Sequence, residues 1–443
     1  MNLSMTKTKT YKQRTYLDPI HGPIELNLND AADLLLAKII DTKEFQRLRR
    51  IRQMGLGCFT FHGAEHTRFG HSLGTLHIAK KMINHLANNF PEINSFKVEI
   101  LISALIHDIG HGPFSHTSEK FTNCTHEDLT KEIISGNTEV NRSIKMYDED
   151  LPKRIIQIFE GETTPLYLTQ IISSYIDCDR LDYLHRDSYF IGVPYGLTGS
   201  ERIIASLEID EKTKKLVVSE TVGLDAVIHY LHARYSMYQQ VYQHKKNLAC
   251  DFLLKKIISR AKEIKPKNTS DILSSWLNFE NKTVKNIDLE NYLQVDDILL
   301  LSNIEKWGSD SYNEKILKDL ANRFMNRKLF KSLEFRQETT EDEINETLEK
   351  LKQIAQSKNL DPDYYIGIEQ SASKPYEPYK ATANKANKAI YIKQQNGLIK
   401  ELSQISGLVK ALSQENIVKT CLIFTGELED QIHKAKGFQE LFK

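Results

Sequence analysis

The chain of 443 residues carries 59 Lys and Arg against 59 Asp and Glu, and this formal net charge of zero excludes a protein that binds nucleic acid or anionic membranes through bulk charge. No run of about 18 apolar residues is present, and the polar, basic start MNLSMTKTKTYKQR is unlike a secretory signal, so neither a bilayer span nor secretion is expected. Five scattered cysteines without a C-x-x-C pair are typical of reduced thiols, which predicts a cytoplasmic protein.

The first three quarters of the chain are predicted to be mainly helical. Apolar residues recur there at steps of three and four, the period of an amphipathic helix. Two short β-rich runs that flank the charged turn DEKTKK predict a hairpin. In chain order, the predicted elements are helices over 71–86, 97–109 (stopping at Gly110) and 165–187, the hairpin over 207–223, and a longer helix over about 224–264.

Beyond about residue 335 the character of the sequence changes. A charged helix is predicted over 339–358, followed by the strand-like runs YYIGIE, AIYIK and VKTCLIFT. The lysine-rich stretch from Ser373 to Lys400 is interpreted as a solvated loop. We therefore expect a mainly α fold with a small β-hairpin over 1–335, in which about 1–14 are flexible, and a smaller α+β region over 336–443.

Histidines are concentrated in one part of the chain. Fifteen occur, and nine of them fall within 65 consecutive residues. Imidazole binds transition metals and exchanges protons near neutral pH, so this local excess indicates a reaction centre. The nine are His62, His66, His71, His77, His85, His107, His111, His116 and His126.

The segment LIHDIGHGPFSH (105–116) places His107 and Asp108 side by side at the end of a predicted buried helix. Taken alone, the pair is explained by an exposed helix end. However, His71 and Asp179 also lie on segments with apolar faces, so two imidazoles and two carboxylates can converge on one divalent cation. A mixed N/O set suits Fe, Mn, Zn, Ni or Co better than Mg or Ca, and four protein ligands leave a position open for water.

The pattern H…HD…D and several longer motifs resemble the deoxynucleoside triphosphate triphosphohydrolase branch of the HD-domain metal-dependent phosphohydrolases. The resemblance extends to about residue 335, roughly three quarters of the chain, and implies an HD-domain helical core. The motifs are DPIHGPIEL (18–26), IIDTKEFQRLRRIRQMG (39–55), HTRFGHSLG (66–74), HDIGHGPFSH (107–116), THED (125–128), IDCDRLDYLHRD (176–187), YQHK (242–245) and NRKLF (326–330).

This resemblance implies a role for each matching position. The metal would be held by His71, His107, Asp108 and Asp179. Catalysis would involve His111, His116, His126, Arg68 and Asp108, with either His116 or His126 as the general acid. The substrate would be bound by Gln53, Met54, Arg180, Tyr183, Asp187, Arg234, Tyr242 and Gln243. Among these, Arg68, Arg180 and Arg234 would hold the triphosphate, Tyr183, Asp187 and Gln53 the deoxyribose, and Tyr242 with Met54 would exclude a 2′-hydroxyl.

The implied reaction is metal-dependent hydrolysis of a dNTP at the α-phosphorus, which releases the deoxynucleoside and inorganic triphosphate. The residues supply what such a reaction requires: a site for water activation, cations for a polyanion and a proton donor. Mg would accompany the substrate triphosphate. The choice of the α- over the γ-phosphorus rests on the resemblance alone.

The resemblance also implies a regulatory site. In the family, the positions of Asp41, Gln46 and Arg49 read a guanine base between subunits, which is chemically reasonable because a carboxylate accepts from the guanine N1–H and N2–H₂ groups. Activation by GTP or dGTP and a homodimer or homotetramer are therefore expected; the alternative is an ordinary solvated helix turn. The predicted site is Arg14, Asp41, Gln46, Arg49, His244 and Lys245.

The sequence departs from the family pattern at three of its positions. Gly70 stands where an acidic residue is frequent, and Arg180 stands where lysine is frequent. Arginine keeps a phosphate contact but changes its geometry. Gln240 replaces a basic position near the second regulatory nucleotide, so the identity of that nucleotide and the need for it stay open.

Two other functions are compatible with an HD core. A phosphodiesterase or nuclease for oligonucleotides or cyclic nucleotides would leave the substrate 3′-oxygen open, where Asp187 and Gln53 are expected to seal it. A non-catalytic nucleotide sensor would have no use for four costly ionisable ligands. Nucleic acid is not supported as a partner. Structural roles are expected for His62, His66, His77, His85, Tyr235 and Tyr238, and for Asp182 as a surface ion pair with a neighbouring arginine.

Overall fold

The structure is a computed structural model that describes residues 12–122, 124–278, 284, 287–309, 313–378, 388–434 and 438–443. Most of the predicted flexible start, residues 1–11, lies outside this range. The described chain opens with an antiparallel hairpin that packs beside a first helix, whose N-terminus is capped because Asp30 accepts a hydrogen bond from the backbone N–H of Asp33. These elements are β1 (Gln13–Asp18), β2 (Gly22–Asn27), α1 (Ala31–Asp41) and α2 (Lys43–Gln46).

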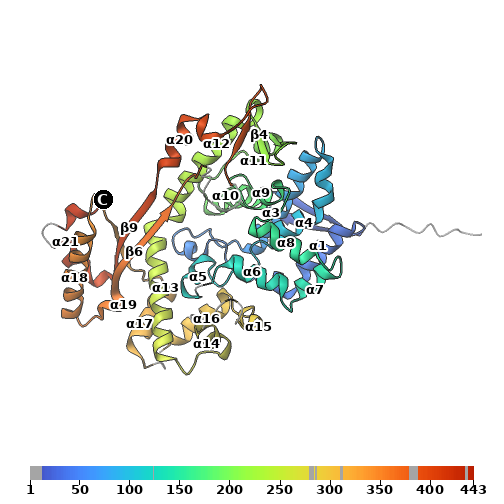
Figure 1. The fold of residues 1–443 in the computed structure, drawn as a ribbon. Helices are drawn as coiled ribbons and strands as arrows, with labels where there is room; N and C mark the ends of the chain where they lie inside the picture. Colours follow the sequence, from blue (N-terminus) through green and yellow to red (C-terminus); the bar gives the residue numbers. More distant parts are fainter. Residues whose placement is uncertain are drawn as a thin grey trace, which may run out of the picture.

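A group of helices follows and forms the main core, on the right of Figure 1. Its central helix α3 packs between α4 and α10. Leu76, Ala79 and Ile83, which recur at steps of three and four, are fully buried on it. The helices are α3 (Arg68–Ala87), α4 (Lys97–Ile106), α5 (His116–Thr122), α6 (His126–Ser135), α7 (Glu139–Lys145), α8 (Leu151–Glu160), α9 (Tyr167–Ile172) and α10 (Cys178–Ile191).

Two predicted helices of this group differ in their limits. α4 ends at Ile106, one turn before Gly110, because Thr130 of α6 closes its end: the Thr130 hydroxyl donates to the His107 carbonyl and accepts from the Gly110 N–H at 3.0 Å. The predicted helix over 165–187 is two helices. Asp177 caps the second helix: its carboxylate accepts from the Arg180 N–H and also from the Ser174 N–H, both at 2.7 Å. A side chain that takes backbone N–H groups away from the helical hydrogen bonds ends a helix at that point.

The predicted hairpin and the long helix after it are also present, the helix in two parts. β3 (Leu207–Ile209) pairs antiparallel with β4 (Leu216–Ser219), and α12 begins directly after it. A π-helical turn and a new N-cap at His244 interrupt the helix, and such turns occur mostly at functional sites. The elements are α11 (Ser200–Ala205), α12 (Glu220–Met237), the π-turn (Tyr238–Tyr242) and α13 (Lys245–Ile264).

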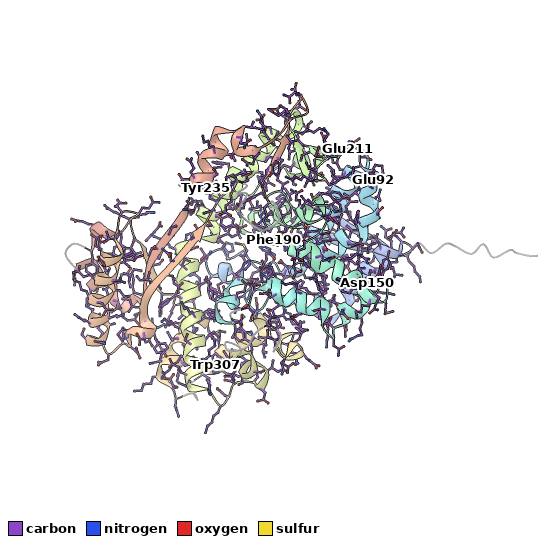
Figure 2. The ribbon with its side chains drawn as sticks, in the orientation of Figure 1. Glu92, Asp150, Phe190, Glu211, Tyr235 and Trp307 are labelled. Atoms are coloured by element: carbon purple, nitrogen blue, oxygen red, sulfur yellow. The ribbon has the colours of Figure 1, made fainter. Side chains whose placement is uncertain are left out.

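A smaller helical group lies at the bottom of Figure 1. It surrounds Trp307, which is fully buried and is labelled in Figure 2. The group consists of α14 (Asp271–Leu277), α15 (Leu289–Tyr292), α16 (Asp297–Gly308) and α17 (Lys315–Met325).

The C-terminal part is α+β, as predicted, and the long strands β6 and β9 run alongside α13 (Figure 1). One sheet has the order β5-β9-β6, and the other joins β3-β4 to β7-β8 through a parallel β4–β7 pair. The elements are β5 (Lys331–Glu334), α18 (Glu341–Ser357), α19 (Pro362–Tyr365), β6 (Ile366–Ser373), β7 (Tyr391–Lys393), β8 (Ile399–Glu401), α20 (Gly407–Gln414), β9 (Ile417–Phe424) and α21 (Glu429–Lys434).

The predicted loop over 373–400 is therefore only partly a loop, because it contains β7 and the start of β8; residues 379–387 lie outside the described range. Both larger sheets pair strands from the two sides of residue 335. Tyr376 and Ile392 belong to the main core, whereas Phe335 and Leu351 belong to a second, smaller one. The division at residue 335 stays a prediction.

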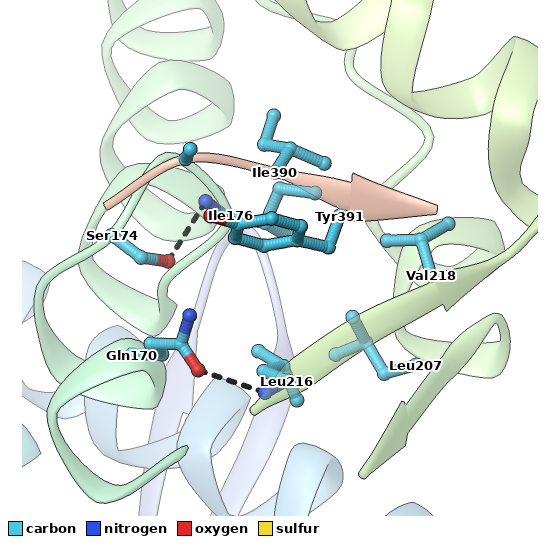
Figure 3. A pocket seen from close by; sticks show the side chains of 9 residues that line it. Gln170, Ser174, Ile176, Leu207, Leu216, Val218, Ile390 and Tyr391 are labelled. Carbon is cyan, nitrogen blue, oxygen red and sulfur yellow. Dashed lines mark hydrogen bonds between the residues drawn. The ribbon is translucent and has the colours of Figure 1, made fainter. Parts of the chain in front are cut away.

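A small pocket lies between the segment after α9 and the β3-β4-β7-β8 sheet (Figure 3). It has room for about one water molecule. Gln170 fixes one wall by accepting from the Leu216 N–H at 2.8 Å. None of its lining residues belongs to the predicted site: they are Gln170, Ser174, Ile176, Leu207, Leu216, Val218, Ala389, Ile390 and Tyr391. Among the described residues, no helix combines the length and hydrophobicity that crossing a membrane requires.

Candidate active site

The structure brings the four predicted metal ligands together from three segments. His71 lies in the first turn of α3, His107 and Asp108 in the turn after α4, and Asp179 in the first turn of α10. His71 Nε2 lies 3.2 Å from His107 Nε2, 3.4 Å from Asp108 Oδ2 and 3.1 Å from Asp179 Oδ1. His107 Nε2 lies 3.3 and 3.5 Å from the same two carboxylate oxygens.

These separations fit a shared divalent cation. Ligand atoms about 2.1 Å from one ion are about 3.0 Å apart at right angles and about 3.4 Å apart in a tetrahedron. The distances between the ring nitrogens and the carboxylate oxygens, from 3.1 to 3.5 Å, lie close to these values. Two nitrogens and two oxygens form the mixed set that first-row transition metals favour.

Both imidazoles are oriented so that Nε2 faces the centre. His71 Nδ1 lies 2.8 Å from Asp182 Oδ2, and His107 Nδ1 lies 2.9 Å from the Ala104 carbonyl oxygen. Because carboxylate and carbonyl oxygens only accept, both Nδ1 atoms donate. In the neutral rings the lone pair is therefore on Nε2, which is the form that binds a metal.

The electrostatics of the site also favour a cation. Burial acts to lower the pKa of His107, but the charge and hydrogen bonds of Asp108 and Asp179 outweigh it and raise this pKa to about 10. Burial also acts to lower the pKa of His71, but hydrogen bonds to the same two carboxylates outweigh it and raise this pKa well above its ordinary value. The carboxylates thus strongly stabilise positive charge at this point.

Arg68 is buried directly beside the ligand group. Its Nη1 donates to Asp108 Oδ2, its Nε donates to the Ser115 hydroxyl at 2.8 Å, and its side chain is only 4% exposed. Burial alone would raise the pKa of Asp108, but the charges of Arg68 and His107 hold it well below its usual range. Asp108 is therefore an anion that connects the predicted phosphate-binding arginine to the predicted metal ligands.

The three predicted catalytic histidines surround one carboxylate, Glu119, which the sequence analysis missed. Glu119 Oε1 lies 2.7 Å from His126 Nδ1 and 3.2 Å from His116 Nδ1. His111 is fully buried, stacks on His126 at 3.8 Å between ring centroids, and has neither ring nitrogen hydrogen-bonded. Burial lowers the pKa of His111 well below its ordinary value, whereas the bond to Glu119 outweighs burial and raises the pKa of His126.

A group of polar and aromatic side chains adjoins the ligand group on the side of Tyr183, whose ring contacts the rings of both His71 and Tyr242 edge-on. The Tyr242 hydroxyl donates to Asp187 Oδ2 at 2.9 Å, and His66 Nε2 lies 2.6 Å from the other oxygen of Asp187.

In the same group of side chains, His66 stacks on Phe190, which is labelled near the middle of Figure 2. The Gln53 side-chain oxygen is buried without a partner, and Met54 is half-buried next to it in the chain.

The other predicted triphosphate ligands are occupied by the protein itself. Arg180 donates to Asp177 and to the Ser174 carbonyl, and Arg234 donates to the Pro375 carbonyl. Both guanidinium groups lie near the Tyr175 ring, and both keep a buried Nε–H without a partner. Gln243 donates to the Ser373 hydroxyl at 3.1 Å.

The predicted regulatory residues form two separate groups. Arg14 and Asp41 make a two-pronged ion pair at 2.7 Å, and Gln46 accepts from Arg49 at 2.9 Å. The hydrogen bonds from Arg14 lower the pKa of Asp41. His244 and Lys245 lie elsewhere, at the start of α13, which Figure 1 places away from α1.

Two supporting residues, Asp182 and Glu119, were misinterpreted or missed. Asp182, interpreted as a surface ion pair, is fully buried and bonds His71, because α10 packs against α3 along that side. His66, for which a structural role was predicted, is buried and bonds Asp187. Glu119 had one signal in the sequence, its spacing of three residues from His116, which places both on one helix face.

Several known proteins are similar to this chain. The HD-domain family model matches residues 68–187. The uncharacterized protein YwfO of Bacillus subtilis is 36% identical over 91% of this chain and 90% of its own length. The deoxynucleoside triphosphate triphosphohydrolase SAMHD1 homolog of Dictyostelium discoideum is 30% identical over 68% of this chain, which spans 63% of that protein. The crystal structure of a phosphohydrolase from Bacteroides thetaiotaomicron superposes with a TM-score of 0.80 at 30% identity, over 93% of this chain and all of that one.

The helical fold and the His/Asp group thus define an HD-domain protein of the phosphohydrolase class. Within that class, the chain belongs to the family of YwfO, and it is similar to the SAMHD1 triphosphohydrolases, of whose length it spans 43 to 63%.

Proposed function

We propose that the chain hydrolyses deoxynucleoside triphosphates to the deoxynucleoside and inorganic triphosphate, using a divalent metal held by His71, His107, Asp108 and Asp179. The observation that supports the choice of substrate is the burial of Asp187 close to Tyr183. Asp187 is 3% exposed, and His66 and Tyr242 bind its two oxygens. A buried polar group of this kind suits a free 3′-hydroxyl, whereas a nuclease must leave space for the next nucleotide.

A polyanionic substrate is supported by the cations around the ligand group. Arg68, Arg180 and Arg234 all lie in buried or half-buried positions near Asp179 or its neighbours. The buried Nε–H groups of Arg180 and Arg234 without partners are donors ready for phosphate oxygens. Guanidinium groups fixed in place before binding stabilise the charge that develops on a reacting phosphoryl group.

When bound, a divalent cation such as Fe, Mn, Zn, Ni or Co supplies a Lewis acid that makes water nucleophilic at neutral pH, while Mg accompanies the substrate triphosphate. The chain's own residues do the rest. Arg68 offsets charge on the α-phosphate, and Glu119 orients the rings of His116 and His126 by hydrogen bonds to their Nδ1 atoms.

We assign delivery of the proton to the leaving 5′-oxygen to His116. Its side chain is 66% exposed, whereas His126 Nε2 is directed towards Asp108, at 4.0 Å. His126 and Glu119 then keep His116 supplied with a proton.

Regulation by a guanine nucleotide, GTP or dGTP, is part of this proposal. Arg14 and Asp41 form an exposed pair worth about 0–1 kcal/mol, so a guanine edge can displace Arg14 from the carboxylate at small cost. Because α13, which begins at Lys245, lies away from α1, which ends at Asp41 (Figure 1), a site that contains both helix ends requires a second copy. A homodimer or homotetramer follows from the same reasoning.

The test is chromatography of purified protein incubated with each dNTP, singly and mixed, with Mn²⁺ or Fe²⁺. Release of deoxynucleoside with intact triphosphate is expected. Pyrophosphate with a deoxynucleoside monophosphate, or cleavage only of oligonucleotide or cyclic nucleotide controls, would refute the proposal.

Tyr242→Ala should raise ribonucleotide turnover, because it removes the side chain proposed to exclude a 2′-hydroxyl. Tyr235→Ala is the matched control, since the Tyr235 hydroxyl hydrogen-bonds Gln239 and, within the described ranges, no predicted site residue. Equal ribonucleotide rejection in both variants would remove Tyr242 from the sugar gate.

A further inference from the structure

Behind the metal-ligand group lies a second, fully buried carboxylate, Asp182 on α10. Its Oδ2 accepts from His71 Nδ1 at 2.8 Å, and its Oδ1 lies 2.6 Å from His21 Nε2. Arg186, one turn further along α10, donates to both oxygens at 2.8 and 3.0 Å. A buried carboxylate costs free energy unless its charge is compensated, and here two rings and a guanidinium compensate it.

The network continues from Arg186 into the turn of the first hairpin. Arg186 Nη1 donates to Asp18 Oδ2 at 2.8 Å. The other oxygen of Asp18 accepts from the backbone N–H groups of Ile20 and His21 at 2.9 and 3.0 Å. The motif DPIHG therefore folds as a turn that fixes both Asp18 and His21, and the ring of His21 contacts Asp182 directly.

The backbone leaves room for this network and for little else. A Cβ at Gly74 would lie 1.9 Å from Asp182 Oδ1 and 2.4 Å from Arg186 Nη2. Gly74 is three residues after His71 on α3, so the helix that carries a metal ligand has no side chain where the supporting carboxylate must pass. Asp182 thus has a dedicated place directly behind His71.

We propose that Asp182, held by His21 and Arg186, is a positioning residue of the metal centre: it fixes the ring of His71 so that Nε2 faces the cation. This inference rests on the metal centre of the proposed function. A carboxylate that accepts from the second nitrogen of a ligating imidazole locks the ring orientation and makes the first nitrogen a stronger donor. The hairpin turn Asp18–Gly22 is then an outer support of the metal site, although it contributes no ligand.

The test is calorimetric titration of Mn²⁺ into metal-stripped protein, without nucleotide. Asp182→Asn, which keeps the shape of the side chain, should weaken Mn²⁺ binding about 10- to 100-fold. The matched control is Asp187→Asn, because Asp187 is also buried on α10 and bonds a histidine, His66, that is not a metal ligand. That variant should bind Mn²⁺ like the wild type. A folded Asp182→Asn protein with wild-type affinity would overturn the proposal.

Two milder variants keep the proposal testable if Asp182→Asn does not fold. Asp18→Asn and His21→Gln each remove one outer partner and should weaken Mn²⁺ binding less than Asp182→Asn; wild-type affinity in both would overturn the proposal. Absorption spectra of the Co²⁺-loaded variants separate positioning from a structural role, because a merely structural residue lowers the melting temperature and leaves the spectrum unchanged. Since no nucleotide is present, a protein that binds Mn²⁺ as expected but leaves dNTPs intact contradicts only the proposed function.

Discussion

Asp297, the first residue of α16, gives a pH-dependent prediction for the wall of the site. Its Oδ1 accepts from the Phe114 N–H at 2.7 Å and its Oδ2 from the Arg52 N–H at 3.0 Å. Phe114 and Ser115 both adopt the left-handed conformation, with φ of 55° and 56°, which is unfavourable for such residues. A buried carboxylate therefore holds the strained turn that leads to His116.

Burial raises the pKa of Asp297 to about 6, against 3.8 for the ordinary group. Below about pH 4 the carboxyl is protonated in both the folded and the unfolded chain. The folded state then has the full stabilisation that comes from keeping this group uncharged. As the pH rises, the unfolded chain ionises first, so this contribution is lost between about pH 4 and 6. At 1.36 kcal/mol per pKa unit, the loss amounts to about 3 kcal/mol.

The assay compares urea unfolding of the wild type and Asp297→Asn from pH 4 to 7.5. The asparagine cannot ionise. The free energy of unfolding of the variant should therefore rise by about 3 kcal/mol relative to that of the wild type as the pH increases across this range. Replacing one acceptor oxygen by an amide group also changes the stability of the variant, but by the same amount at every pH, so it does not affect the shift. Fluorescence is suitable, because both tryptophans, Trp276 and Trp307, belong to the helical group that contains α16. A difference independent of pH would refute the reasoning.

Three further variants test the metal, the proton donor and the regulatory site. Asp179→Ala should abolish both Mn²⁺ binding in calorimetry and dNTP turnover; a fully active variant would exclude the proposed centre. Glu119→Gln should lower kcat by about 10²-fold or more and move the alkaline limb of its pH profile to lower pH, because the bond that raises the pKa of His126 is weakened. Asp41→Ala should bind Mn²⁺ normally but lose activation by GTP or dGTP, as measured by dNTP turnover; unchanged activation would remove the regulatory site.

The metal-ligand group was accessible from the sequence because its signal is local and chemical. His107 and Asp108 are adjacent in an apolar context, and the longer motifs around them select His71 and Asp179 among many ionisable residues. The predicted helices before and after them then place all four on one side of the core. Hydrophobic periodicity and the order of the motifs are therefore sufficient to predict most of this part of the site.

The supporting residues were not accessible in the same way. Asp182 reaches His71 across 111 positions of the chain, and only the packing of α10 on α3 makes that contact. On the sequence alone, Asp182 and Arg186 at a spacing of four are indistinguishable from an exposed ion pair. The helix break at Asp177 was missed for a related reason, because apolar periodicity continues through it while the side chain caps the next helix.

The C-terminal region illustrates the limit of motifs most clearly, because it contacts the candidate site mainly through its backbone. The segment after β6 accepts the Arg234 hydrogen bond with the Pro375 carbonyl, and the Glu377 N–H donates to the Tyr175 hydroxyl at 2.8 Å. Any residue type supplies a backbone carbonyl, so no pattern of side chains marks this role. Arg234 keeps its Nε–H without a partner while its Nη1 donates to Pro375, so the C-terminal segment fixes the guanidinium and leaves one donor unused. The contacts of the α+β region with Arg234 and Tyr175 therefore depend on main-chain atoms, which only the fold brings into place.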